Sequence, residues 1–193
     1  RMNGSVGDFN VKIRIKPRYI KPGANPERLR SAMKNYKGEE CPDEYNYGIT
    51  SKKPIYIPPN AYPEKPVVYP KCFNPTDDFL SAYSDCIDLA QNEEQMEFNA
   101  GAILVTTGFD TYEPDEGEYG YKQSEKVVTL QQLKRMIEIN PENELKQNGH
   151  PVKNIVFIYC VGSRQGENGN QYCSRYCCTS AIHTSLLLRN KYK

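Results

Sequence analysis

The sequence lacks several features that would assign it to a familiar class of protein. It contains no tryptophan, and its formal net charge of +1 favours neither nucleic acid nor an anionic membrane as a partner. No apolar run approaches the roughly 20 residues that a membrane-spanning helix needs. The polar start, with no apolar stretch behind it, gives no sign of a signal peptide. We therefore expect a cytoplasmic chain with no direct membrane insertion.

The sequence also has a low hydrophobic content and no methionine at its first position. Hydrophobic residues make up 38% of the sequence, which is low for a single well-filled globule of 193 residues. The chain also lacks a methionine at position 1, because it begins RMNGSVGDF, and it ends in LLLRNKYK. We interpret it as a piece of a longer protein.

The cysteines are the most informative residues that the sequence does contain. There are seven, an odd number, whereas secreted disulfide frameworks usually use an even set. Without a secretory signal, metal binding is favoured over disulfides. Four of them lie near the C-terminal end and form what we call the C-terminal cysteine group: Cys160, Cys173, Cys177 and Cys178.

The sequence around this group predicts a strand, a glycine-rich loop and a helix. Residues 154–161 form a continuous apolar run typical of a buried strand, and residues 173–189 are predicted to be helical. The loop glycines do not have the GxGxxG spacing, which argues against a dinucleotide site. On such a helix Cys173 and Cys177 would share one face, and the loop would bring Cys160 to the same point.

Four thiolates that meet at one point are the usual ligand set of a [4Fe–4S] cluster. The positive end of the helix, together with Arg164 and Arg175, would favour the negative charge of such a centre. Three alternatives remain: a zinc ion on four thiolates, a redox disulfide between Cys173 and Cys177, and ordinary buried core thiols. An adjacent cysteine pair is awkward for zinc knuckles, and the disulfide leaves two thiols unexplained.

The rest of the sequence predicts a mixture of strands and helices. Apolar alternation predicts a strand over Asp8–Ile15, and the proline-rich residues 20–91 predict a loop-rich insertion with a thin core. A continuous apolar strand of the buried parallel kind is predicted over 101–110, where Thr107 and Gly108 mark its end. The other predicted elements are helices over 26–36, 77–89 and 129–138, and short strands at 55–57 and 95–98.

Two motifs carry a resemblance to a known family. The stretches CVGSR at 160–164 and YCSRYCC at 172–178 resemble the A subunit of heterodisulfide reductase, a flavin-containing iron–sulfur protein. That family carries CVGSR, then YCSRxCC followed by a helix. GAILVTTGFD at 101–110 resembles the family's ATGF segment, and residues 6–20 resemble the strand that leads into its ferredoxin insertion. The resemblance covers most of the chain.

The resemblance implies an α/β fold. We expect a Rossmann-like, thioredoxin-reductase-like flavoprotein portion that is interrupted by a small α+β insertion derived from ferredoxin. Only Cys41, Cys72 and Cys86 remain where the family has two cysteine-rich motifs, so the insertion is expected to have lost one or both clusters. The implied divisions are a flavoprotein strand segment (1–19), the insertion (20–92), a return to the flavoprotein domain (93–150) and a strand–loop–helix unit with the cysteine group (151–193).

The resemblance also implies a function in electron transfer. The C-terminal cysteine group would hold a [4Fe–4S] cluster, and Thr107 and Gly108 would lie beside FAD in the parent protein. The cluster would relay electrons between flavin and the other subunits of a heterodisulfide-reductase-like complex. We expect part of an oxidoreductase subunit without complete activity of its own. The alternative is a non-redox structural or docking module with zinc or free cysteines.

Overall fold

The computed structural model describes residues 2–140, 144–167 and 169–192, and the chain divides into two compact units, Arg1–Thr107 and Gly108–Lys193. The first unit is built on a three-stranded antiparallel sheet in the order β1-β2-β7. Its strands are β1 (Met2–Ser5), β2 (Asp8–Ile15) and β7 (Glu94–Ala100).

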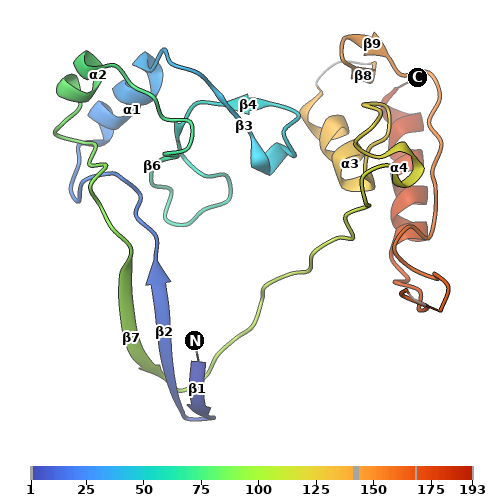
Figure 1. Ribbon diagram of the computed structural model, residues 1–193, viewed down its shortest axis with the longest axis horizontal. Coiled ribbons are helices and arrows are strands. Elements are labelled where there is room, and N and C mark those ends of the chain that lie inside the picture. The colour runs from blue at the N-terminus through green and yellow to red at the C-terminus, as the bar shows by residue number, and fades with distance from the viewer. Residues whose placement is uncertain (1, 141–143, 168, 193) are drawn as a thin grey trace. The chain divides into compact units, whose positions relative to one another are not determined.

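The alternation of side chains along β2 sorts the sheet into an apolar and a polar face. Val11 lies opposite Phe98 on one face, whereas Lys12 lies opposite Glu97 on the other and forms a 2.9 Å ion pair with it. Figure 1 shows β2 and β7 as a long ribbon that leads to the helices of this unit. The predicted strands at 8–15 and 95–98 are therefore confirmed.

The segment between β2 and β7 contains two α-helices, one 3-10 helix and four very short strands. These elements are α1 (Pro26–Asn35), β3 (Cys41–Pro42), η1 (Glu44–Asn46), β4 (Ser51–Lys52), β5 (Ile55–Tyr56), β6 (Val67–Val68) and α2 (Asp77–Ala82). Asn25 caps α1 by accepting backbone N–H groups, and Thr76 caps α2 in the same way. The helix predicted over 77–89 is shorter than expected and ends at Ala82. There the Arg28 guanidinium donates a hydrogen bond to the Ala82 carbonyl oxygen, which would otherwise accept the next bond within the helix.

A small core holds this segment together. Its buried residues are Leu29, Ala32, Tyr36, Ile55, Val68, Tyr83, Cys86 and Ile87. Tyr36 extends it by stacking on Phe73, with ring centroids 5.5 Å apart. Cys41 and Cys72 are joined in a disulfide. The thin core expected for this segment is thus present, with one covalent link that the sequence did not predict.

The second unit packs a short helix against the C-terminal helix. Its elements are η2 (Glu118–Gly120), α3 (Leu130–Ile139), β8 (Lys146–Gln147), β9 (His150–Pro151) and α4 (Cys177–Lys191). A capping box starts α3: the Thr129 hydroxyl accepts from the Gln132 N–H, and the Gln132 side chain accepts from the Thr129 N–H. Leu133, Ile137 and Leu145 form the buried core of this unit. The helix predicted over 129–138 is confirmed.

The two buried strands predicted over 101–110 and 154–161 do not form. Both segments are extended and lie in no ladder. Most of their apolar side chains are exposed, with Leu104 at 87% and Val156 at 85%, whereas Phe157 packs against the core of the second unit. A strand must share its N–H and C=O groups with a neighbour. The described residues of each unit offer none to these segments. The fold is therefore mixed α/β with small antiparallel sheets, and the Rossmann-like arrangement is not seen in the described residues.

Membrane insertion by a helix finds no support in the part of the chain that is described. None of its helices combines the length and the apolar character needed to cross a bilayer.

Candidate metal centre

Cys160 occupies a tight turn at the end of an extended segment. Its φ of 61° places it in the left-handed region, and its carbonyl oxygen accepts the Ser163 N–H at 3.2 Å. Gly162 follows with φ +73°, and a Cβ there would lie 2.2 Å from a ring carbon of Tyr112. Only glycine therefore fits this position, because both the backbone angle and the tyrosine ring exclude a side chain.

The loop after this turn folds back on itself. The Arg164 N–H donates to the Tyr172 carbonyl at 3.1 Å, and the Gln165 N–H donates to the Asn170 carbonyl at 2.8 Å. The Asn170 side-chain amide then donates to the Gly162 carbonyl at 3.1 Å. These bonds return the chain, just before Cys173, to the turn that carries Cys160.

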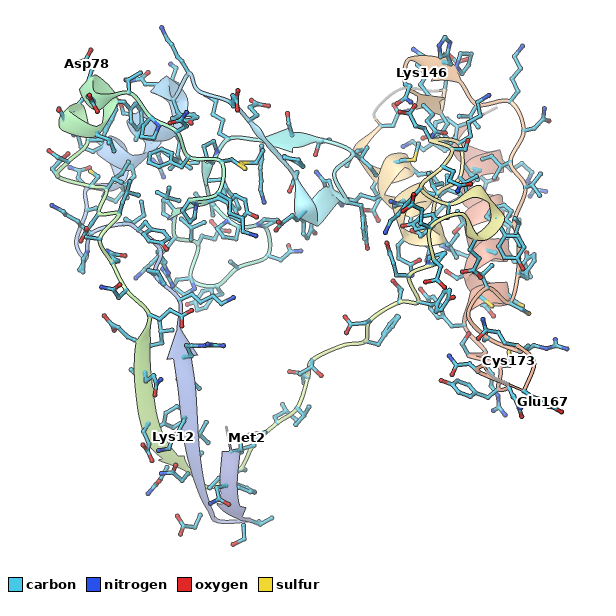
Figure 2. All side chains as sticks on the ribbon, in the orientation of Figure 1. Met2, Lys12, Asp78, Lys146, Glu167 and Cys173 are labelled. Atoms are coloured by element: carbon cyan, nitrogen blue, oxygen red, sulfur yellow. A yellow bond between two sulfur atoms is a disulfide. The ribbon has the colours of Figure 1, made fainter. Side chains whose placement is uncertain are left out.

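Helix α4 begins at Cys177, so the sequence-based prediction of a helix from 173 is wrong at its start. Arg175 has a φ of 57°, which no α-helix tolerates, and its N–H donates to the Cys173 sulfur at 3.4 Å. Cys173 therefore precedes the helix and does not share a helix face with Cys177. Figure 2 shows labelled Cys173 in the loop beside the first turn of α4.

The four thiols influence one another electrostatically. Burial disfavours the Cys177 thiolate, but hydrogen bonds from the Ser174 hydroxyl and the Cys160 N–H outweigh it and lower the pKa of Cys177 below 9.0. Burial raises the pKa of Cys178, as does its hydrogen bond to Cys177. Negative charge on Cys160 and Cys173 raises the Cys178 pKa further. All four predicted ligands therefore lie near enough to interact.

The group is not gathered around a single point. Within the described ranges, no three His, Cys, Asp or Glu side chains are placed to hold one metal ion. A [4Fe–4S] cluster gives each cysteine its own iron, so its ligands surround a larger body than those of one zinc ion. An all-thiol donor set with N–H groups near the sulfurs fits the ligand chemistry of an iron–sulfur cluster, and four thiolates are also a usual ligand set for zinc.

Sequence reasoning missed the residues that support this group. Tyr112 lies in an acidic stretch typical of a solvated loop, yet its ring covers Gly162 and its hydroxyl donates to Glu118 at 3.0 Å. Lys134 reaches α4 from α3 and donates to the Ser180 hydroxyl. No motif marks either residue, because both contacts depend on how distant segments pack.

The residues predicted to lie beside FAD do not line a formed site. Thr107 and Gly108 belong to the extended segment, both are exposed, and no atom lies within 4 Å of a Cβ built on Gly108. These two residues alone do not make a flavin site. The remaining cysteines are the disulfide pair Cys41 and Cys72 and the buried thiol Cys86.

The chain is similar to several curated proteins over almost all of its length. It is 34% identical over 202 residues to the A subunit of the ferredoxin/F420H2-dependent CoB-CoM heterodisulfide reductase of Methanosarcina acetivorans. It is 33% identical over 207 residues to the A subunit of the H2:CoB-CoM heterodisulfide,ferredoxin reductase of Methanothermobacter marburgensis. It is 35% identical over 198 residues to one of the iron–sulfur A subunits of the CoB–CoM heterodisulfide reductase of Methanopyrus kandleri.

These matches cover 98–99% of this chain but only 25–30% of each relative. No protein-family model matches. The similarity agrees with the cysteine motifs and spans both structural units. The chain is therefore homologous to heterodisulfide reductase A subunits over nearly all of its own length and is a partial-length counterpart of them.

Proposed function

We propose that Cys160, Cys173, Cys177 and Cys178 hold a [4Fe–4S] cluster. The chain would then be the electron-transfer portion of a flavoprotein oxidoreductase like the A subunit of heterodisulfide reductase. The observation that carries the proposal is the loop whose backbone pairs return the chain, just before Cys173 and the start of α4, to the turn that carries Cys160. Homology to proteins named as iron–sulfur subunits supports it.

When bound, a [4Fe–4S] cluster supplies one-electron transfer. The chain's own part is to provide four thiolates and to stabilise their charge. The Cys160 N–H donates toward the Cys177 sulfur, and the Arg175 N–H donates toward the Cys173 sulfur. Hydrogen bonds of this kind favour the more negative state of a sulfur ligand and help to set its potential. The Cys178 N–H, in the first turn of α4, donates toward the Cys177 sulfur as well and acts in the same direction.

We further propose the division of the chain into segments 1–19, 20–92, 93–150 and 151–193. The pairing of β2 with β7 supports an insertion, because the chain leaves and re-enters the ribbon at the same end, where Ile15 lies opposite Glu94. The exposed apolar segments would complete a Rossmann-like sheet with strands of the flavoprotein. Flavin and the other complex subunits would be the electron partners, and a cytoplasmic location stays a prediction.

The test is the metal content of the chain, purified without oxygen or reconstituted with iron and sulfide. We expect a brown protein with absorbance near about 400 nm, roughly four iron atoms per chain and no zinc. Cys177→Ser should lose the cluster, because serine removes a thiolate ligand. Cys86→Ala is the matched control: it deletes a thiol in the other unit and should keep the iron.

Two outcomes would overturn the proposal in different ways. Stoichiometric zinc, or a colourless protein after reconstitution, would favour the non-redox docking module. Unchanged iron in Cys177→Ser, with iron lost in Cys86→Ala, would move the centre to the insertion.

A further inference from the structure

The inserted segment contains a covalent link far from the C-terminal cysteine group in sequence. Cys41, in β3, and Cys72, in the turn after β6, form a disulfide between positions 31 residues apart. Their Cα atoms are 5.8 Å apart. That separation lies within the about 4.4–6.8 Å usual for disulfides. The backbone alone therefore brings the two sulfurs within bonding reach.

The two cysteine residues of the disulfide differ in their exposure to solvent. Cys41 is fully buried, whereas Cys72 is partly exposed in a turn closed by the Cys72 N–H and the Tyr69 carbonyl. A thiolate attacks the sulfur that it can reach, and the other sulfur leaves. Attack at Cys72 with Cys41 as the leaving group is thus the accessible route.

Short ladders and polar contacts also hold the enclosed loop in place. Its ladders, β3 with β4 and β5 with β6, contain two residue pairs each. Ile55 and Val68 are its buried aliphatic side chains in the core. The Tyr69 hydroxyl donates to Glu44 at 2.8 Å, and the Lys53 ammonium donates to two carbonyl groups of α1. Covalent closure adds to these contacts by limiting how far the loop can open when they break.

The link also borders the aromatic part of the core. Phe73, the next residue after Cys72, stacks on Tyr36 and lies 6.2 Å from Phe79 of α2, centroid to centroid. Release of Cys72 would free the turn that positions Phe73. Loosening would therefore spread from the loop toward the packing of α1 against α2.

We propose that the Cys41–Cys72 disulfide is a thiol-exchange site that switches the inserted segment between a closed and a loosened state. The reaction partner is a dithiol reductant. One of its thiolates attacks the Cys72 sulfur, the S–S bond breaks, and Cys41 leaves as a thiolate that takes up a proton. The second thiol of the reductant then displaces Cys72 and closes its own disulfide, so the protein gains two electrons and two protons.

The test is hydrogen exchange of the full chain before and after dithiothreitol, with cysteine labelling by maleimide and peptide mapping. Before reduction, neither Cys41 nor Cys72 should be labelled, and after it both should be. Amides between residues 43 and 69 should then exchange about tenfold faster or more. Amides of α4 provide the internal reference for effects on the other unit.

Variants separate this site from other thiols. Cys41→Ser/Cys72→Ser should match the reduced chain and not respond to dithiothreitol, whereas Cys86→Ala should respond as the wild type does. If the double variant does not fold, reoxidation of the reduced wild type should restore the slow exchange. Labelling of both cysteines before reduction, or unchanged exchange after it, would overturn the proposal. Neither result depends on whether the C-terminal cysteine group binds iron.

Discussion

Replacement of Gly162 by alanine tests the local geometry of the candidate metal centre. The residue lies two positions after Cys160 and has a φ of +73°. An alanine Cβ would meet three ring atoms of Tyr112 at 2.2–2.5 Å, so the ring must move. The Tyr112 ring is held by the hydrogen bond of its hydroxyl to Glu118, 3.0 Å long. The substitution therefore strains the backbone of the turn and also displaces the Tyr112 ring that covers it.

The cost can be estimated from these two effects. Left-handed backbone costs an alanine about 1–2 kcal/mol relative to glycine. Loss of the hydrogen bond between Tyr112 and Glu118 adds about 1 kcal/mol. The sum, about 2–3 kcal/mol, corresponds to roughly 30- to 150-fold in the equilibrium that orders the turn.

Hydrogen exchange and iron retention measure the effect on the turn and on the site. We expect amides around 160–167 to exchange faster in Gly162→Ala and the reconstituted protein to lose iron sooner to a chelator. Gly166→Ala is the control, because that glycine has neither a positive φ nor a neighbour within 4 Å of its Cβ position. Adding Tyr112→Ala should recover the steric part of the loss. Exchange equal to the wild type in Gly162→Ala would refute the reasoning.

Three further predictions concern stability. Thr129→Ala should remove the capping box of α3 and cost about 1 kcal/mol in chemical unfolding of the second unit, whereas Thr129→Ser should not. Leu29→Ala should cost the first unit about 2–5 kcal/mol, because the buried side chain leaves a cavity. The hydrogen bond from Arg28 lowers the pKa of Asp85. The pair therefore stabilises the fold at pH values above the ordinary carboxyl pKa of 3.8, and this stabilisation is lost as the pH falls through the lowered pKa of Asp85. In Asp85→Asn the thermal unfolding midpoint should therefore fall less steeply with decreasing pH than it does in the wild type.

Elements set by neighbouring residues were predictable from the sequence. Helix α1 starts where Asn25 and Pro26 place it, and α3 starts at the capping box of Thr129. The end of α2 was not predictable in this way. It depends on Arg28, which lies 54 residues before Ala82 in sequence and binds its carbonyl oxygen.

The apolar runs at 101–110 and 154–161 show the limit of inferring burial from composition. An apolar run indicates that a segment can be buried, but a strand also needs a neighbouring strand that supplies hydrogen bonds. The described residues of neither unit provide that neighbour. The family resemblance was confirmed by homology, whereas its Rossmann-like sheet remains a proposal.

The grouping of the four thiols around one centre stays a prediction, and the way their segment folds differs from the sequence-based expectation. A helix through Cys173 would have placed Cys173 and Cys177 on one face, but the left-handed backbone of Arg175 rules out a helix there. The loop instead returns Cys173 toward the turn of Cys160 by backbone pairs that the residue types do not encode. Glycine and asparagine in the loop indicated a turn without indicating its hydrogen bonds.

The order of the candidate centre therefore depends on its loop. The segment before Cys160 belongs to no ladder, so no sheet fixes where that sulfur lies. What fixes it is local: the Ser163 N–H on the Cys160 carbonyl, the Asn170 amide on the Gly162 carbonyl, and the Tyr112 ring against Gly162. Each is a single weak contact of about 1 kcal/mol, and their effects combine because they close one turn. A strand partner for 154–159 would add ladder bonds just before this turn and hold Cys160 more tightly than the loop alone.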